Sequence, residues 1–186
     1  MENEWNPDHM SKQDQIVEFL REHDRFLEPI IHEPVVILRR EVIDIGPGTR
    51  IDSFVKLEGG LGLRIGRCVH IASFAHINVG GGEVVLEDYT AVASGSKIIA
   101  GSNLTQAQSL SACAPVDMQR VLRLKTTLKE YAAVYVNSVV APGVTLHEGA
   151  VLAANSIAMD DIPAWQVWGG SPARFLRYRK IGDRWI

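Results

Sequence analysis

Aliphatic residues recur every six positions along most of the chain, and this is the dominant pattern of hydrophobic and polar residues in the sequence. The recurring positions are Ile45, Ile51, Leu57, Ile65, Ile71, Ile77, Leu86, Val92, Ile98, Leu128, Val134, Val140, Leu146 and Leu152. The residue four places after each of them is small or compact: all but Leu61 and Gly81 are Ser, Thr, Ala or Val. A repeat of fixed length is the sequence signature of a solenoid.

A six-residue unit accommodates one short strand and one corner. Three such units return the chain to a point one strand spacing, about 4.8 Å, above its start. The pattern therefore predicts an all-β fold, a three-sided parallel β-helix of about five to six coils with the recurring aliphatic residues inside. A β-sandwich is the alternative, but it predicts two-residue alternation and irregular turn spacing.

Three segments lie outside this regular repeat. Ser11-Lys-Gln-Asp14 resembles a capping box and precedes an amphipathic stretch, so residues 1–34 are expected to form an N-terminal helix and cap. The period is lost over residues 99–127 and then resumes, which predicts an extruded loop within a β-helix domain of residues 35–162. A loop of this length in a compact solenoid is usually functional. Residues 163–186 are expected to form a tail with a short C-terminal helix.

Composition and charge exclude several classes of protein. The hydrophobic fraction of 46% is ordinary for a globular chain, and the net charge of −3 provides no basic field for binding nucleic acid. No run approaches the roughly 20 apolar residues of a membrane span, and the N-terminus lacks the features of a signal peptide, so a cytoplasmic location is expected. Cys68 and Cys113 do not form a metal or redox motif, and no metal site is predicted.

The repeat and the segment after it contain motifs of a known family. They are Val140-Ala-Pro-Gly-Val-Thr-Leu-His-Glu-Gly-Ala-Val-Leu-Ala-Ala-Asn-Ser156, Asp160-Asp-Ile-Pro163 and Gly169-Gly-Ser-Pro-Ala-Arg174, with a further match in Val69-His-Ile-Ala72 and Gly80-Gly-Gly82. In these motifs the chain resembles the hexapeptide-repeat acyltransferases, and among them the sugar O-acetyltransferases that modify bacterial surface polysaccharides. The resemblance implies a left-handed coil and a homotrimer whose active sites lie between subunits.

The reaction that the resemblance implies is transfer of an acetyl group from acetyl-coenzyme A to a sugar hydroxyl, without a covalent enzyme intermediate. His70 is the candidate general base, because a neutral imidazole accepts a proton near pH 7 and a positioned base contributes on the order of 10²–10⁴ in rate. His76 holds the same place in the next unit and is a candidate substrate contact or alternative base. Either histidine is also compatible with a corner residue that only bonds to the backbone.

The acceptor, a sugar or sugar nucleotide, is expected to contact the base of the long loop. Ser102 and Asn103 lie there, and short polar side chains suit the recognition of hydroxyl groups. Relatives have acidic residues just after this point, and this chain lacks them, which leaves the acceptor open. The two residues are also compatible with a role limited to turning the chain out of the coil.

The coenzyme is expected to lie along the last coils. Val136 and Ala154 match positions that line its groove in the family, and Arg174 and Arg177 match positions beside its nucleotide. A charge-assisted hydrogen bond from arginine to phosphate contributes about 1.5–3 kcal/mol. Trp168 replaces a small residue of most relatives and is a candidate for stacking on adenine, although an aromatic residue near a solenoid end often belongs to the core.

Three other functions fit the same sequence. The first is an N-acetyltransferase that acts on an amino sugar nucleotide, which differs only in the acceptor. The second is a γ-class carbonic anhydrase, a trimeric prism with a zinc ion held by three histidines from two subunits; His70 and His76 raise this alternative, but a third histidine on a neighbouring coil is missing. The third is a binding module that has lost catalysis.

Overall fold

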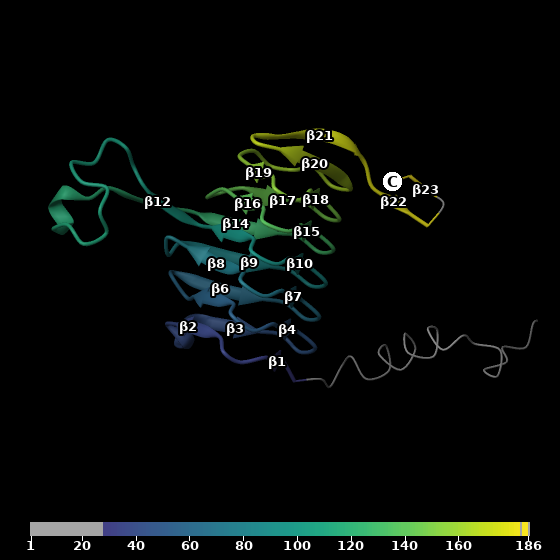
Figure 1. Cartoon of the computed structure of the whole chain (residues 1–186), viewed down its shortest axis with the longest axis horizontal. Coiled ribbons are helices and arrows are strands. Elements are labelled where there is room, and N and C mark those ends of the chain that lie inside the picture. The colour runs from purple at the N-terminus through teal and green to yellow at the C-terminus, as the bar shows by residue number, and fades with distance from the viewer. Residues whose placement is uncertain (1–27, 183, 186) are drawn as a thin grey trace, which may run out of the picture.

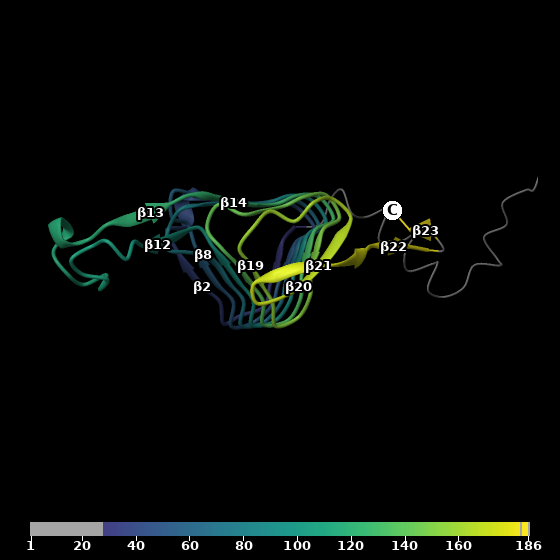
Figure 2. The ribbon, with the colours of Figure 1, turned by 90° about the horizontal axis from the view of Figure 1, so that it is seen from above.

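The structure is a computed structural model that describes residues 28–182 and 184–185. Its described residues form a stack of coils with three flat faces, and the view along the stack shows the triangular outline (Figures 1 and 2). The expected N-terminal helix falls in residues 11–27 and so lies outside the described residues. Over the described part of the chain, no helix is long and apolar enough to cross a membrane.

Three parallel sheets make the faces of the prism. The first face holds β1 (Ile30–Ile31), β4 (Arg50–Ile51), β7 (His70–Ile71), β10 (Ala91–Val92), β15 (Ala133–Val134), β18 (Val151–Leu152) and β20 (Gln166–Gly170). The second holds β2 (Val36–Leu38), β5 (Lys56–Glu58), β8 (His76–Val79), β11 (Lys97–Ile99), β16 (Val139–Val140) and β19 (Ile157–Ala158). The third holds β3 (Ile43–Ile45), β6 (Gly62–Ile65), β9 (Glu83–Leu86), β14 (Lys125–Leu128) and β17 (Thr145–Leu146).

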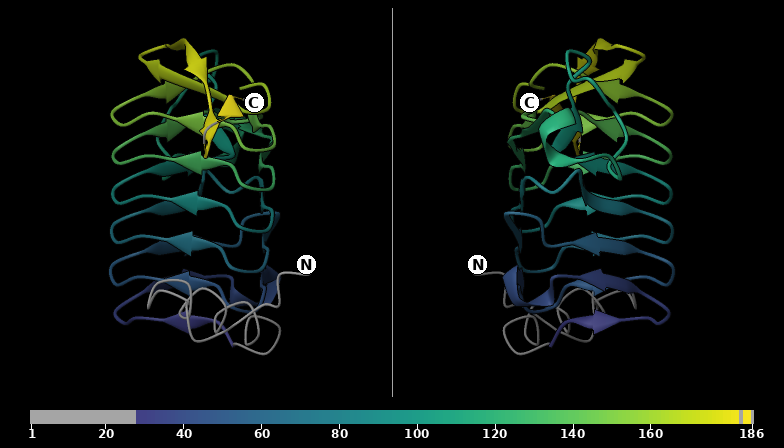
Figure 3. Two further views of the ribbon diagram at one scale, coloured as in Figure 1. Left: turned by 90° about the vertical axis from the view of Figure 1, so that its right-hand side faces the viewer. Right: turned by 90° about the vertical axis from the view of Figure 1, so that its left-hand side faces the viewer.

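The prism has about seven turns, more than the five to six that the sequence predicts. The sheet of the first face has eight strands, of which only β21 (Ala173–Tyr178) runs antiparallel, so seven successive coils cross this face (Figure 3). The additional turns lie at the two ends, where the six-residue pattern is imperfect. There β1 pairs with β4, and β20 pairs with β18.

The recurring aliphatic residues fill the interior, as the period predicts. Each from Ile51 to Leu152 is at most 1% exposed, and Ile45 is partly exposed. The compact residues four places later are buried at the corners wherever the coil is regular. Leu61 is the exception among the aliphatic ones, because it lies at a bulged corner and is 67% exposed.

Two ladders of left-handed backbone positions form the corners beside the first face. The first corner, between the first and second faces, contains Phe54, Phe74, Gly95, Asn137 and Asn155, each with φ between 54° and 73°. The third corner, between the third and first faces, contains Gly48, Cys68, Tyr89, Tyr131, Gly149 and Trp165 in the same conformation. A residue in the left-handed region turns the chain sharply, so one such residue per coil produces each corner.

The long loop is a folded arm that projects from the edge between the second and third faces (Figures 1 and 2). Its base is the antiparallel pair β12 (Gly101–Asn103) and β13 (Val121–Arg123), and its outer part contains a short 3₁₀ helix, η4 (Val116–Met118). The excursion is slightly shorter than residues 99–127, because Ile99 ends β11 and Lys125 begins β14. A second 3₁₀ helix, η3 (Arg40–Val42), lies in the first coil.

The structure corrects the sequence prediction of a short C-terminal helix. Instead of a short helix, the described residues of the C-terminal segment form strands: β20 is followed by β21, which turns back and pairs antiparallel with it, and then by β22 (Lys180–Ile181) and β23 (Arg184–Trp185). Gly169-Gly-Ser-Pro172 makes the reversal, and these residue types favour a turn over the start of a helix. The unpaired edge of β20 is thereby satisfied by β21, which caps the end of the solenoid.

Candidate active site

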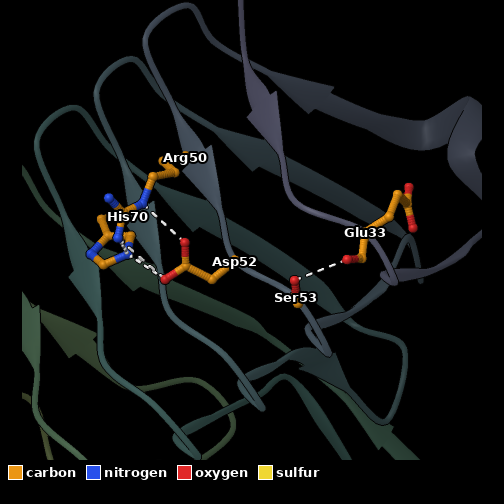
Figure 4. Close-up of polar contacts among 5 residues, drawn as sticks. All are labelled: Glu33, Arg50, Asp52, Ser53 and His70. Atoms are coloured by element: carbon orange, nitrogen blue, oxygen red, sulfur yellow. Dashed lines mark hydrogen bonds and ion pairs between the residues drawn. The ribbon is translucent and has the colours of Figure 1, made fainter.

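His70 lies on the outer surface of the first face and is hydrogen-bonded to a carboxylate of the preceding coil. Its Nε2 is 2.9 Å from Oδ2 of Asp52, and its side chain is 43% exposed (Figure 4). The register of β4 and β7 pairs Arg50 with His70, so Asp52, two residues further along, reaches the imidazole diagonally. Arg50 is bound to the same carboxylate through its Nε, 2.9 Å from Oδ1.

The hydrogen bonds around Asp52 decide which nitrogen of His70 carries a proton. Arg50 Nη2 also lies 3.0 Å from His70 Nε2, and a single Nε2 cannot both donate to Asp52 and accept from Arg50. The guanidinium is already directed at the Asp52 carboxylate, and a hydrogen bond to an ionised acceptor is the stronger one. We therefore infer that Nε2 of His70 carries the hydrogen and donates a hydrogen bond to Asp52. The lone pair of Nδ1 is then available to accept a proton from a substrate.

Asp52 is ionised at neutral pH in this arrangement. Partial burial acts to raise its pKa, but the hydrogen bonds and charges of His70 and Arg50 outweigh burial and hold the pKa below its usual value of 3.8. A carboxylate that orients an imidazole also stabilises the imidazolium that forms when the imidazole takes a proton. Asp52 is thus suited to a positioning role.

The second face repeats this arrangement one unit later. His76 Nε2 is 2.8 Å from Oε1 of Glu58, and Lys56 Nζ is 2.6 Å from the same oxygen. Burial acts to raise the pKa of Glu58, but the hydrogen bonds from Lys56 and His76 prevail and lower it. In both pairs the carboxylate precedes its histidine by eighteen residues, which is two residues fewer than the 20 of one coil. The two imidazoles lie on different faces of one chain.

The last coils carry a groove on the first face, and basic side chains are among the residues that line it. Its volume is about 300 Å³, and it is lined by Tyr135, Val151, Ala153, Val167, Leu176, Arg177, Arg179 and Lys180. Four strand spacings separate β7 from β20, so roughly 19 Å lies between His70 and this end of the face. That distance is of the order spanned by an extended pantetheine arm. Small side chains, Ala91 and Ala133, pair in register between the two ends.

Four of the remaining sequence-predicted residues lie at this end of the prism. Val136 and Ala154 are exposed at the first corner, one coil apart, beside groove residues Tyr135 and Ala153. Arg177 lines the groove, whereas Arg174 lies near the start of β21 with Nη1 3.6 Å from Asp160. The structure thus brings these four residues to the same few coils.

The other three predicted residues lie apart from the groove and from His70. Trp168 packs against the hydrophobic core, with its Nε1 donating to Gln166. Ser102 and Asn103 lie on the arm, and the Asn103 amide donates to the carbonyl of Leu110. The arm projects from the edge opposite the first face, so within one chain these two residues do not join the His70 site (Figure 2).

A second concavity of about 550 Å³ lies elsewhere and contains none of the predicted residues. It is lined by Asp44, Gly46, Pro47, Arg64, Ile65, Gly66, Arg67, Leu86, Glu87, Asp88 and Glu130. Its charged groups are of both signs, and Arg67 contacts Asp88 at 2.9 Å. Among the described residues, no group of three His, Cys, Asp or Glu side chains gathers to hold a metal ion.

Sequence reasoning missed the carboxylates and cations beside the histidines. Arg50, Asp52, Lys56 and Glu58 lie in hexapeptide units that contain no family motif, and only the 20-residue spacing of one coil places them below the imidazoles. The sequence did contain a signal for these residues, because one pattern occurs in it twice. The pattern is a cation, a carboxylate two positions later, and a histidine eighteen residues after the carboxylate.

Comparison with known proteins identifies the class of this chain. No protein-family profile matches the sequence. The chain is 30% identical over 139 residues to dTDP-4-amino-4,6-dideoxy-D-glucose acyltransferase of Escherichia coli, an alignment that covers 74% of this chain and 72% of that protein. This chain therefore belongs to the hexapeptide-repeat acyltransferases that have the left-handed parallel β-helix fold.

Solved structures show the same fold. AntD, an N-acyltransferase from Bacillus cereus, was solved as a point mutant in complex with dTDP and coenzyme A; it matches with a TM-score of 0.76 and 24% identity over 91% of both chains. AntD was also solved with dTDP and 3-hydroxybutyryl-CoA. A hexapeptide-repeat acetyltransferase of Vibrio cholerae matches with a TM-score of 0.56, 20% identity and 93% of this chain against 84% of that one.

Proposed function

We propose that this protein transfers an acyl group from an acyl-coenzyme A to the amino group of a nucleotide-linked sugar. The Escherichia coli relative is named for such an acceptor, and the Bacillus cereus neighbour is an N-acyltransferase solved with dTDP and coenzyme A. The amine therefore replaces the sugar hydroxyl as the preferred acceptor. In this chain the observation that carries the proposal is the hydrogen-bonded pair of His70 and Asp52 at one end of a face whose other end is basic.

His70 performs the proton transfer in this proposal. Its Nδ1 accepts the proton of the sugar amine as the nitrogen attacks the thioester carbonyl. The tetrahedral intermediate then collapses with cleavage of the carbon–sulfur bond. The proton passes from the imidazolium to the departing sulfur, so the products are the amide and free coenzyme A. Asp52 holds the ring and stabilises the imidazolium, and no covalent enzyme intermediate is needed.

The coenzyme is placed along the first face. Its pantetheine arm would follow the small residues toward Ala153 and Ala154, and its phosphates would lie beside Arg177 and the neighbouring basic groups of the groove. Arg174, Val136 and Trp168 complete this proposed set from the same end of the prism. A homotrimer with sites between subunits would bring the His76 face, and the arm with Ser102 and Asn103, against the His70 face of a neighbour.

Product analysis tests this function directly. The protein is incubated with acetyl-CoA and either a dTDP-linked 4-amino sugar or its 4-hydroxy counterpart, and released thiol and product mass are followed. We expect an acetylated product from the amine that survives mild base, as an amide does. An ester formed only from the hydroxyl sugar, or no product from either acceptor, would contradict the proposal.

A further inference from the structure

Two phenylalanine rings at the first corner are stacked on each other and exposed to solvent. The centroids of Phe54 and Phe74 are 5.2 Å apart, the ring planes differ by 4°, and the residues are 56% and 64% exposed. Both residues have left-handed backbone, a conformation that is costly for an aromatic residue. Phe74 lies between His70 at the end of the first face and His76 at the start of the second.

No ring follows Phe74 at the next position of the corner ladder, and we call this position, at Gly95, the gap. Phe54 covers the ring from the preceding coil, and the residue in the next coil is Gly95, whose N–H donates to the carbonyl of Ser73. Gly95 has no side chain to cover the ring. The coil beyond it contributes Asn137, whose Oδ1 lies against the position that a Cβ on Gly95 would occupy. The carboxamide therefore occupies the place of a Cβ on Gly95 and fills the inner part of the gap.

The third corner shows how this chain closes an equivalent gap. There Tyr89 and Tyr131 are stacked with centroids 5.4 Å apart, and the next coil again has a glycine, Gly149. In that place Trp165 folds over the glycine, since its ring lies against the position of a Cβ on Gly149, and it stacks against Tyr131 at 6.3 Å. At the first corner the Asn137 carboxamide lies over the glycine in the same way, but the described residues supply no third ring, so the exposed part of the Phe74 ring remains available to another planar group.

Polar groups beside the gap match a nucleotide. A carboxamide offers two donors and an acceptor, which complements the imide edge of a pyrimidine base. Lys97 is exposed and its Nζ donates to the carbonyl of Gly95 at 3.1 Å. Among the described residues, no carboxylate forms an ion pair with Lys97. Its charge is thus positioned beside the gap, where it can meet a phosphate.

We propose that Phe74, Gly95, Asn137 and Lys97 form a binding site for a pyrimidine nucleoside diphosphate. The base stacks on Phe74 in the space above Gly95, the Asn137 carboxamide binds the edge of the base, and Lys97 binds a phosphate. The identification of this ligand with the nucleotide of the acceptor rests on the proposed function, and it would hold the attached sugar between the two histidine–carboxylate pairs.

Calorimetric titration with dTDP in the absence of an acyl donor tests this site without chemistry. Phe74→Leu removes the stacking ring, and Gly95→Asn places a side chain in the gap, which also displaces the Asn137 carboxamide from its place against Gly95. Because base stacking on an aromatic ring contributes substantially to binding, each variant should bind dTDP about tenfold or more weakly. Tyr89→Leu, the matched change at the third corner, should bind as the unchanged protein does.

Titration with coenzyme A shows whether the site binds the nucleotide of the acceptor or the adenine nucleotide of the coenzyme. Both variants should retain its affinity within about twofold; a loss for coenzyme A with dTDP unaffected would assign the ring to the adenine of the coenzyme and overturn the proposal. Unchanged dTDP binding in both variants, or no dTDP binding by the unchanged protein, would also overturn it. So would a fall in assembled mass on light scattering, because the rings would then lie in a subunit contact.

Failure of this nucleotide site and failure of the proposed reaction give different results. If Phe74-dependent dTDP binding is present but no amino sugar is acylated, the nucleotide site stands and the proposed reaction fails. If an amino sugar nucleotide is acylated and Phe74→Leu has the unchanged KM, the reaction stands and the site fails.

Discussion

Single residues carry most of the chemistry in this account, and His70 is the first of them. A positioned general base contributes on the order of 10²–10⁴ in rate, so His70→Ala should lower kcat by about a hundredfold or more and leave coenzyme A binding nearly unchanged. His147→Ala is the matched control, because His147 also lies near a carboxylate, 3.8 Å from Asp161, but on the third face. Turnover of His70→Ala close to that of the control would remove His70 from the mechanism.

Asp52 acts through His70, and its variants separate charge from shape. Asp52→Asn keeps the volume of the side chain but removes the charge that stabilises an imidazolium. We expect kcat to fall by about tenfold or more with the acceptor KM nearly unchanged, and Asp52→Glu to restore part of the rate. A change confined to KM, or an equal loss in both variants, would indicate that Asp52 only maintains the local fold.

The same carboxylates make stability depend on acid pH. The pKa values of Asp52 and Glu58 in the folded chain lie below their usual values of 3.8 and 4.5, so the unfolded chain binds these protons first as the pH falls. The two carboxylates contribute fully to the stability of the folded chain when the pH is above their pKa values in the unfolded chain. This contribution is lost from about pH 5 downward, as the pH falls through their pKa values in the folded chain. The double variant Asp52→Asn and Glu58→Gln should therefore lose less free energy of unfolding between about pH 5 and pH 3. An unaltered pH slope in denaturant titrations would contradict this.

At the scale of the elements, buried hydroxyl groups tie successive corners together. Ser138 Oγ donates to the carbonyl of Ala153 at 2.7 Å and accepts from the N–H of Ser156, whose own hydroxyl accepts from Gly170 of the terminal hairpin. Ser138 is fully buried, so Ser138→Ala leaves a donor and an acceptor without partners. We expect a loss of about 1–3 kcal/mol in the free energy of unfolding. Ser102→Ala, whose hydroxyl is exposed, should change it by less than about 0.5 kcal/mol.

The arm is an element that the prism does not need. Its neck is closed by Leu124 N–H donating to Ala100 and by the pairing of Ser102 with Leu122, and the coil continues at Lys125. Replacing residues 103–121 by Asn-Gly, a two-residue hairpin turn, should therefore leave the melting temperature within a few degrees of the original. If the arm contacts the acceptor, the acceptor KM should rise. Loss of folding would show that the arm stabilises the coil.

The elements also show what the sequence could and could not predict. The six-residue period alone was sufficient to predict the prism, because every coil must bury one aliphatic residue per face, as Ile51, Leu57 and Ile65 do. The C-terminal strands were missed because β21 has no buried alternation: only Ala173 is buried, and its partner is the backbone edge of β20. Such an edge-satisfying strand has no hydrophobic signal of its own.

At the scale of the whole molecule, the candidate site joins groups that are far apart in the sequence. Family motifs predict His70 and the arginine tail as site residues. They do not predict Asp52, because its position beside the imidazole depends on which residues of the previous coil pair with the strand of His70. A single face of the prism thus presents a histidine–carboxylate pair and, four coils along, a basic groove. This arrangement is the central claim, since the coenzyme must extend along the face for the reaction to occur.

A crystal structure of the protein with bound coenzyme A measures this arrangement directly. We predict that the adenosine diphosphate lies beside Arg177 and that the sulfur lies within contact distance of the His70 imidazole. A sulfur atom beside His76 with no His70 nearby, or a coenzyme that does not follow the first face, would contradict it.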